Sequence, residues 1–269
     1  MTKVIGQTKL MSIIDSYTLQ TLPRTLMLIG QSGCGKHTIS KYISEKFDLV
    51  YAEIDESISS TDIENFLYST INTLYVIDLT KFSEKQQNAI LKFIEEPSKS
   101  VYIILTACSE AGILNTILNR CLKYTFEPYT KQEVEHITGM VINEKAFTIF
   151  KTPGKLLNMT DTSFNTVIDL ADRVVKNIHS ASYANTLAVS TKINYKDLYN
   201  KVDFNLFFDA VEYLALEAFK VNGTQRSFII FKITNQFKQY ATQTNLIKET
   251  LMLNYLTTLW EAVHDISRT

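Results

Sequence analysis

An α/β domain with a parallel sheet, followed by helical segments, is the fold class that the sequence predicts. Five short apolar runs alternate with amphipathic segments up to about residue 126, and after residue 128 the strand signals stop. Glycine and proline are scarce, at 8 and 4 of 269 residues, which favours long helices over a turn-rich all-β fold. We therefore expect a sheet domain at 1–128, a small helical lid at 129–161 and an all-helical domain at 162–269.

The predicted strands are runs rich in β-branched, aromatic and leucine residues. They read TLMLIG (25–30), FDLVYAEI (47–54), TLYVID (73–78), SVYIILTA (100–107) and LKYTFE (122–127). Helical stretches lie between some of them, at 36–47 and 84–94. Because strands that are joined through helices form right-handed crossovers, we expect the sheet to be parallel and covered on both faces.

The segments after the sheet carry helical signals. YTKQEVEHI (129–137) begins with a capping box, in which Thr130 and Glu133 satisfy each other's backbone. Two short helices follow it, the second with Thr152 as its cap and Pro153 in its first turn. From residue 163 onward the chain is expected to be helical, because apolar residues recur every three or four positions in FNLFFDAVEYLALEAF and LMLNYLTTLWEAV.

Composition limits the classes of function. The net charge of −1 gives no global reason to expect nucleic-acid binding, so such a contact must come from a local patch. No apolar run approaches the ~18 residues of a membrane span, and MTKVIGQTKL lacks an apolar signal core, so a cytoplasmic protein is expected. The cysteines Cys34, Cys108 and Cys121 fit neither a disulfide framework nor a CxxC zinc site, and we expect them to be small buried residues.

A phosphate-binding loop is predicted within LMLIGQSGCGKHTIS (26–40). Gly30, Gly35 and Lys36 satisfy the pattern G-x-x-x-x-G-K between an apolar strand and a helix. In such a loop the glycines let the backbone wrap the phosphates, the amides at the helix N-terminus point at the anion, and the lysine neutralises the outer phosphates. A glycine-rich turn that binds nothing is the alternative. The loop residues expected to bind the nucleotide are Gly30, Gln31, Ser32, Gly33, Cys34, Gly35, Lys36, His37 and Thr38.

Two positions depart from those of a hydrolytic P-loop protein. His37 stands where a Ser or Thr normally holds Mg²⁺, which prefers oxygen ligands, so the metal is expected to be held weakly or through water, unless His37 is merely a surface residue. Asp78 ends a predicted strand, where P-loop ATPases place the carboxylate that orients Mg²⁺. The next residue is Leu79, which cannot activate water as the usual Glu does, and Glu84 is no substitute because Ser83 caps the helix that it begins. Binding of ATP and Mg²⁺ is therefore expected to survive better than hydrolysis.

QNAILKFIEEPS (87–98), followed by IILTACSEAGILNTILNRC (103–121), resembles the AAA+ subunits of replicative clamp loaders. The pattern in bacterial delta-prime and gamma/tau subunits is close to QNALLKTLEEPP and then LLPTIxSRC. VIGQTKL (4–10) is similar to their N-terminal segment and PGKLLNM (153–159) to their lid helix. The resemblance covers residues 4–157 in order, and a compact subunit of a phage or mobile element fits the short chain. Their four-cysteine zinc module has no counterpart here, so zinc is not expected.

The resemblance implies roles for single residues. Arg120 matches the arginine of the SRC motif, which reaches the γ-phosphate bound by the neighbouring subunit; a surface charge at a strand edge is the alternative. Thr106 matches the first sensor and Lys155 the second, the alternatives being a plain strand-end threonine and a surface lysine. Val4 and Ile5 match the N-terminal segment at the nucleotide.

The resemblance also implies partners, namely the other subunits of a hetero- or homo-pentamer, the sliding clamp and primer–template DNA. Lys81, Lys85, Lys92 and Lys99 would contact DNA phosphates, although lysines that alternate with acidic residues also describe a solvated helix face. The helical C-terminal domain is expected to oligomerise, unless its apolar faces only bury one another.

The expected function is that of a clamp-loader subunit in DNA replication, which binds ATP, supplies Arg120 to a neighbour and hydrolyses little or nothing itself. An ATP-hydrolysing motor subunit of the same loader is the first alternative. Another AAA+ replication factor, such as a helicase loader, is the second.

Overall fold

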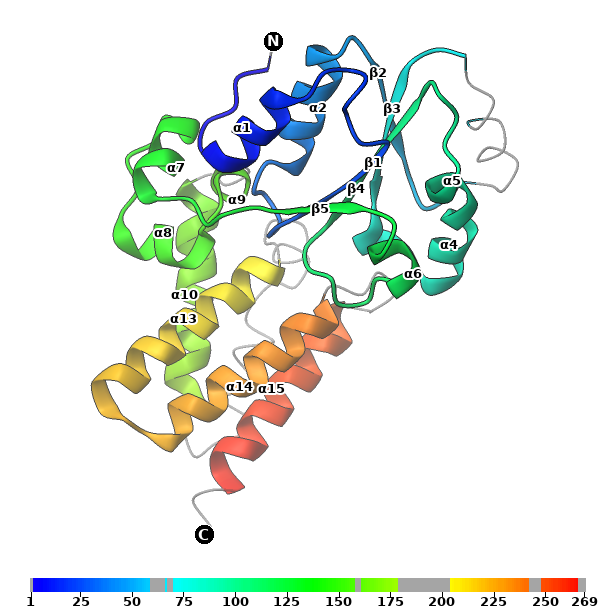
Figure 1. Cartoon of the computed structure of the whole chain (residues 1–269). Helices are drawn as coiled ribbons and strands as arrows, with labels where there is room; N and C mark the ends of the chain where they lie inside the picture. Colours follow the sequence, from blue (N-terminus) through cyan, green and yellow to red (C-terminus); the bar gives the residue numbers. More distant parts are fainter. Residues whose placement is uncertain are drawn as a thin grey trace. The chain divides into compact units, whose positions relative to one another are not determined.

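The computed structural model describes residues 2–58, 66, 70–157, 161–178, 204–241 and 248–265. The chain divides into two compact units (Figure 1). Unit 1 comprises Met1–Ile142 and Lys151–Leu156, and unit 2 comprises Asn143–Phe150 and Leu157–Thr269. The domain boundaries at 128 and 162 stay predictions, and the parts of the predicted helical region at 179–203, 242–247 and 266–269 lie outside the described residues.

Unit 1 is built on a five-stranded parallel sheet, as predicted. Its order is β2-β3-β4-β1-β5, and the central strands β1, β3 and β4 are almost entirely buried because helices cover both faces. The strands are β1 (Thr25–Ile29), β2 (Val50–Ile54), β3 (Thr73–Asp78), β4 (Val101–Ala107) and β5 (Leu122–Thr125). All five apolar runs therefore form the strands expected of them, and the α/β class is confirmed.

Helices α1 and α2 lie on one face of this sheet, and α4, α5 and α6 lie on the other (Figure 1). The helices of unit 1 are α1 (Thr8–Ser16), α2 (Lys36–Lys46), the short 3-10 helix η1 (Leu79–Lys81), α4 (Glu84–Ala89), α5 (Leu91–Glu95), α6 (Asn115–Leu118), α7 (Lys131–Thr138) and α9 (Pro153–Leu157). The predicted capping box of α7 is present, and so is the predicted cap of α4 by Ser83. One helix was expected at 84–94, but it is interrupted at Ile90, whose ψ of −3° lies near the bridge region of backbone space.

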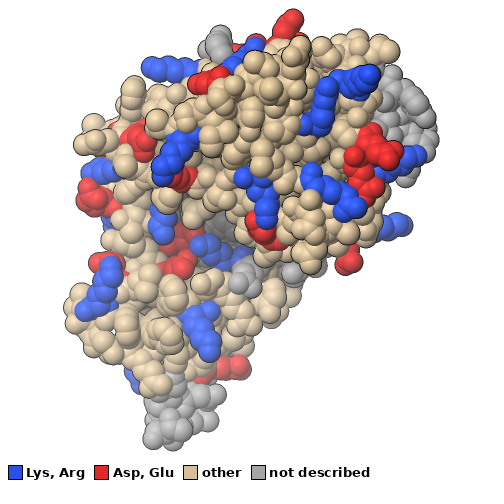
Figure 2. Space-filling model, viewed as in Figure 1, with Lys and Arg blue, Asp and Glu red and all other residues tan. Residues whose placement is uncertain are grey.

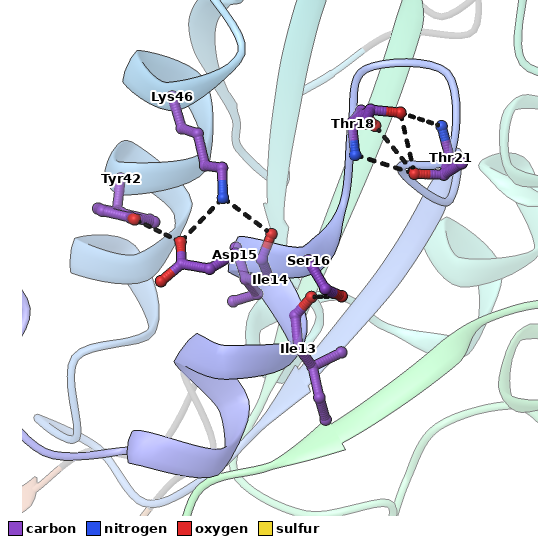
Figure 3. Close-up of polar contacts among 8 residues, drawn as sticks. All are labelled: Ile13, Ile14, Asp15, Ser16, Thr18, Thr21, Tyr42 and Lys46. Atoms are coloured by element: carbon purple, nitrogen blue, oxygen red, sulfur yellow. Dashed lines mark hydrogen bonds and ion pairs between the residues drawn. The ribbon is translucent and has the colours of Figure 1, made fainter.

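The carboxylate of Asp15 connects α1 to α2 through hydrogen bonds (Figure 3). Asp15 accepts hydrogen bonds from the Tyr42 hydroxyl (2.5 Å) and from Lys46 Nζ (2.8 Å), and Lys46 also donates to the carbonyl of Ile14 (3.2 Å). The lysine and the tyrosine hold the pKa of Asp15 below its usual value. Because α2 begins at the predicted phosphate loop, this contact fixes the N-terminal segment relative to that loop.

The face covered by α4, α5 and α6 contains a continuous apolar core. Tyr75, Phe93 and Phe66 meet there, with ring centroids 4.7–6.3 Å apart. Isoleucines and leucines of β3 and β4 complete the core at alternate positions, among them Ile77, Ile103 and Leu105. The residues between them therefore face α1 and α2.

The cysteines do not share one environment. Cys34 is buried, as expected, and Cys121 is only half-buried, whereas Cys108 is exposed, so the expectation is wrong for Cys108. Burial raises the pKa of Cys34 and raises that of Cys121 to about 12. Both thiols are therefore protonated, unreactive packing groups at neutral pH.

Unit 2 is helical in its described parts. It contains α8 (Glu144–Phe150), α10 (Asp161–Asn177), α13 (Phe204–Asn222), α14 (Gln225–Ala241) and α15 (Lys248–Asp265), and the side chain of Phe204 lies outside the described residues. Phe207 and Phe208 pack edge-on against Tyr255, whose buried hydroxyl is 2.8 Å from that of Thr234. No helix in these described parts or in those of unit 1 has both the length and the apolar character needed to cross a bilayer.

Candidate functional site

The predicted phosphate loop connects the end of β1 to the start of α2. Gly33 and Gly35 have φ values of 77° and 96°, which the loop needs to turn and which side chains with a Cβ rarely adopt. Lys36 is the first residue of α2, and its amide follows that of Gly35 at the helix N-terminus. Sequence and backbone therefore agree on a turn that presents amides at the positive end of a helix of 11 residues.

The Lys36 side chain is buried inside this turn. Its ammonium group donates to the carbonyl of Gly30 (2.6 Å) and to that of Gln31 (3.2 Å). Two backbone carbonyl oxygens thus hold the ammonium group of Lys36 within the loop. Such charge-assisted bonds are the stronger kind of hydrogen bond.

Asp78 and Thr106 lie side by side at the carboxyl edge of the sheet. Asp78 pairs with Thr106 in the register of β3 and β4, and Thr106 pairs with Leu28, two residues before Gly30. Directly opposed residues of neighbouring strands share a face, so both side chains lie on the face that α2 covers. The Asp78 carboxylate also accepts bonds from the amide (3.2 Å) and hydroxyl (2.7 Å) of Thr80, which orient it at the start of η1.

The hydroxyl of Thr106 is a buried polar group at this edge of the sheet. Thr106 is 0% exposed, and its Oγ1 has no hydrogen-bond partner among the described residues. Leaving a buried hydroxyl unpaired costs about 1–3 kcal/mol, so such groups usually have a reason.

Leu79 points into the core opposite the phosphate loop. It is 2% exposed and belongs to the apolar cluster that also contains Ile77 and Phe82. The residue after Asp78 therefore differs from a catalytic Glu in its surroundings as well as in its chemistry.

His37 is exposed and turns toward the edge strand β2. Its Nδ1 lies 3.4 Å from Glu53 Oε1 and 3.5 Å from the hydroxyl of Tyr51. Tyr51 donates to Glu53 at 2.7 Å, and this bond, with a smaller effect of His37, lowers the pKa of Glu53. Among the described residues, His37 thus contacts Glu53 and Tyr51 at the surface. The first hydroxyl after Lys36 in α2 belongs to Thr38, which is exposed.

The start of α9 and the residue before it pack directly on the phosphate loop. The hydroxyl of Thr152 donates to the carbonyl of Ser32 (2.8 Å), and the amide of Gly154 donates to that of Gly33 (2.9 Å). A Cβ on either glycine would lie 2.7 Å from backbone of the other segment. Lys155, the predicted second sensor, follows at once, and its amide is 2.7 Å from the position that a Gly33 Cβ would occupy.

The N-terminal segment reaches the same loop through Tyr129. The Tyr129 hydroxyl donates to the carbonyl of Cys34 (2.8 Å), and its ring fills the space beside Gly6. Gln7 exchanges two hydrogen bonds with the backbone of Glu127, just before this tyrosine. Val4 and Ile5, both half-buried, directly precede this contact.

Arg120 lies outside this group of residues, directly after α6. Its Nε is 2.8 Å from Glu95 Oε1 on α5, and a terminal guanidinium nitrogen donates to the carbonyl of Thr116 at 2.8 Å. The Arg120 side chain remains 41% exposed. Glu95 and Thr116 therefore orient a side chain that solvent still reaches. Arg120 lies two residues before β5, an edge strand of the sheet, so this position also suits the alternative of a surface charge at a strand edge.

Gln87, which was not a predicted site residue, fixes the loop that leads to Arg120. It is 2% exposed, its amide nitrogen donates to the carbonyls of Phe82 (3.1 Å) and Gly112 (2.9 Å), and its oxygen accepts from the amide of Leu114 (3.0 Å). The available signal was a polar residue at an apolar position of the segment QNAILKF. Tyr129 and Glu53 gave no comparable signal.

The four candidate DNA-binding lysines are all exposed. Lys81 ends η1, Lys85 and Lys92 lie on α4 and α5, and Lys99 precedes β4. On the face shown in Figure 2, blue Lys and Arg side chains are interspersed with red Asp and Glu. The charges seen there form no single-sign stripe, in keeping with the net charge of −1.

Residues 52–130 match the family model described as DNA polymerase III, delta subunit. This range includes Asp78, Thr106 and Arg120 and begins after the phosphate loop. The chain is 29% identical over 83 residues to DNA polymerase III subunit delta' of Bacillus subtilis (strain 168), which is 30% of this chain and 24% of that protein. It is 25% identical over 168 residues to DNA polymerase III subunit gamma of Buchnera aphidicola subsp. Schizaphis graminum (strain Sg), which is 49% of this chain and 46% of that protein.

The chain thus spans less than half the length of either curated relative. Among solved structures, a DNA polymerase III gamma subunit-related protein from Thermotoga maritima aligns with a TM-score of 0.49 at 14% identity, over 95% of this chain and 99% of that one. The predicted resemblance is confirmed by the family model and the curated relatives: part of the chain is similar to the delta-prime and gamma subunits of DNA polymerase III.

Proposed function

We propose that the chain is a subunit of a sliding-clamp loader in DNA replication that binds ATP and Mg²⁺ and hydrolyses little ATP itself. The observation that carries the proposal is the set of groups at the carboxyl edge of the sheet. A P-loop with a buried lysine lies there beside Asp78 and beside Thr106, whose buried hydroxyl has no partner among the described residues. Ligands of open α/β sheets bind at this edge.

In this proposal the loop amides and Lys36 hold the phosphates, and Asp78 orients the metal through water. Thr106 and Lys155 contact the outer phosphate from the sheet and from the lid segment, and Val4 and Ile5 lie at the base. Bound Mg²⁺ would neutralise charge on the phosphates. His37 is supported as a surface residue by its contacts with Glu53 and Tyr51, so the metal would depend on water and on phosphate oxygens.

Weak hydrolysis is supported by the position of Leu79. A catalytic base must come within hydrogen-bond reach of the attacking water. Leu79 has no proton acceptor and is buried in the opposite core, while Glu84 is the first residue of α4 beyond its cap Ser83. The chain itself would therefore act as a nucleotide-binding component.

Arg120 would act on ATP that is bound by the neighbouring subunit. Its exposure and its support by Glu95 suit a cation that must reach outward with a fixed orientation. The other proposed partners are the sliding clamp and primer–template DNA, with Lys81, Lys85, Lys92 and Lys99 as phosphate contacts. In unit 2, the partly exposed rings of Phe219 and Phe228 lie 6.1 Å apart and offer an apolar surface for contacts between subunits.

Replacing Lys36 with alanine is expected to weaken ATP binding by about 10–100-fold, because hydrogen bonds to charged groups contribute about 1.5–3 kcal/mol. The measurement is calorimetric titration of the purified chain with MgATP. Lys41→Ala, an exposed lysine further along α2, is the matched control and should bind within twofold of wild type. If wild type binds no ATP, or if Lys36→Ala binds as well as wild type, the proposed nucleotide site is wrong.

The same preparation distinguishes the alternatives. If the purified chain hydrolyses ATP at about 1 s⁻¹ or faster, in the ordinary range of enzymes, it is an active motor subunit and the proposal of weak hydrolysis is wrong. Co-purification with a replicative helicase in place of a sliding clamp would favour a helicase loader.

A further inference from the structure

The carbonyl groups of the phosphate loop are held from outside the loop. Three consecutive carbonyls, those of Ser32, Gly33 and Cys34, accept hydrogen bonds from Thr152, Gly154 and Tyr129 at 2.8–2.9 Å. The donors are a buried hydroxyl, a backbone amide and a buried phenol, and they come from segments 95 and 120 residues away along the chain. We call Tyr129, Thr152 and Gly154 the carbonyl clamp.

Fixing a carbonyl also fixes the next amide. A trans peptide is planar, so the C=O of one residue and the N–H of the next point in opposite directions. Bonds to the carbonyls of Ser32 and Cys34 therefore aim the amides of Gly33 and Gly35 away from the clamp. Neighbouring backbone amides that are free of the clamp in this way can form a concave site for an anion.

The clamp also brings the start of α9, which carries Lys155, against the phosphate loop. A Cβ on Gly154 would lie 2.7 Å from the Cα of Gly33, and a Cβ on Gly33 would lie 2.7 Å from the amide nitrogen of Lys155. A movement of the loop toward the clamp would therefore displace the backbone of Lys155.

We propose that the carbonyl clamp is a positioning device, which holds the loop amides ready for the phosphates of ATP and couples the loop to Lys155. The proposal rests on the proposed ATP binding by this loop. None of the clamp residues needs to touch the nucleotide. Their effect is to raise the fraction of molecules whose loop is competent to bind, and the apparent affinity increases with that fraction.

The test removes one hydroxyl at a time. Thr152→Val and Tyr129→Phe keep the side-chain volume and lose only the bond to the loop. Each is expected to raise the Kd for MgATP about 3–10-fold, the range set by one hydrogen bond of about 0.5–1.5 kcal/mol. Without nucleotide, the amides of residues 30–37 should exchange with solvent deuterium faster than in wild type, since the loop opens more often.

Matched controls are present in the same unit. Thr138→Val removes a hydroxyl that donates to the carbonyl of Val134 within α7, and Tyr102→Phe removes one that donates to the carbonyl of Leu19. Both should bind MgATP within twofold of wild type and leave the exchange of the loop unchanged. Coupling is tested by a double-mutant cycle: Thr152→Val and Lys155→Ala should together cost less affinity than the product of their separate fold-changes, whereas a merely structural Thr152 predicts additivity.

Each outcome decides the proposal. It is overturned if the two clamp variants match the controls in both affinity and exchange, or if they bind MgATP more tightly, which would mean that the contacts hold the loop closed against ATP. If wild type binds no MgATP, the proposed function fails, and the exchange measurement alone decides the clamp. Faster exchange of residues 30–37 in the variants then supports it, and equal exchange rejects it.

Discussion

Arg120→Ala is expected to slow ATP hydrolysis by the proposed clamp-loader complex by about 10³-fold or more, the range of effects known for arginine fingers. The Arg120 side chain suits such a role, because Glu95 and the carbonyl of Thr116 orient it while 41% of it stays exposed. An exposed ion pair contributes only about 0.2–1 kcal/mol, so Arg120 can exchange Glu95 for a phosphate at small cost. Binding of MgATP to the chain's own loop should not change.

The measurement is steady-state turnover of the complex formed with the partner subunits, with sliding clamp and primer–template DNA present. Lys123→Ala is the control, because Lys123 also forms an exposed ion pair, with Glu110 at 3.0 Å, on the strand that follows Arg120. The control complex should hydrolyse ATP within twofold of wild type. A complex with Arg120→Ala that keeps full turnover would show that this arginine does not act on the neighbour's nucleotide.

The sequence predicted those features that depend on a few neighbouring residues. The run TLYVID forms β3 from its first residue to its last, since apolar and β-branched residues bounded by turn signals suffice to define a buried strand. The capping box of Thr130 and Glu133 was predicted for the same reason, because both partners lie within one helical turn. The loop at 30–36 was also found from local spacing alone.

Features that join distant segments could not be predicted in this way. The bonds of Tyr129 and Thr152 to the phosphate loop span 95 and 120 residues, and no pattern within either segment signals them. The partners of His37 are on β2, which the sequence identified as a strand without its place at the sheet edge. Burial of Leu79 likewise follows from how η1 packs against β4 and into the apolar cluster, whereas the sequence showed only that the residue is not a Glu.

Leu79→Glu is expected to lower the free energy of unfolding of unit 1 by about 3–5 kcal/mol and not to increase ATP hydrolysis. The Leu79 side chain is 2% exposed and lies within an apolar cluster. A carboxylate in its place would lose its hydration, and no described residue of that cluster is a cation that could pair with it. To escape, η1 would have to leave the core, which would also release the two bonds between Asp78 and Thr80. Changing the residue type alone therefore does not place a base beside a phosphate.

Urea denaturation and ATP turnover, measured on the same preparations, separate stability from chemistry. Leu79→Met keeps the volume and the apolar character and should cost less than about 1.5 kcal/mol. Asn88→Glu adds the same charge at an exposed position of α4 and should change stability by no more than about 0.5 kcal/mol. If Leu79→Glu is as stable as wild type and gains turnover near 1 s⁻¹, the side chain at 79 reaches the nucleotide after all, and weak hydrolysis would follow from the missing carboxylate alone. If it loses stability and gains no turnover, the packing of η1 excludes this position from catalysis, and a hydrolytic ancestor or variant would need a different path of the chain after Asp78.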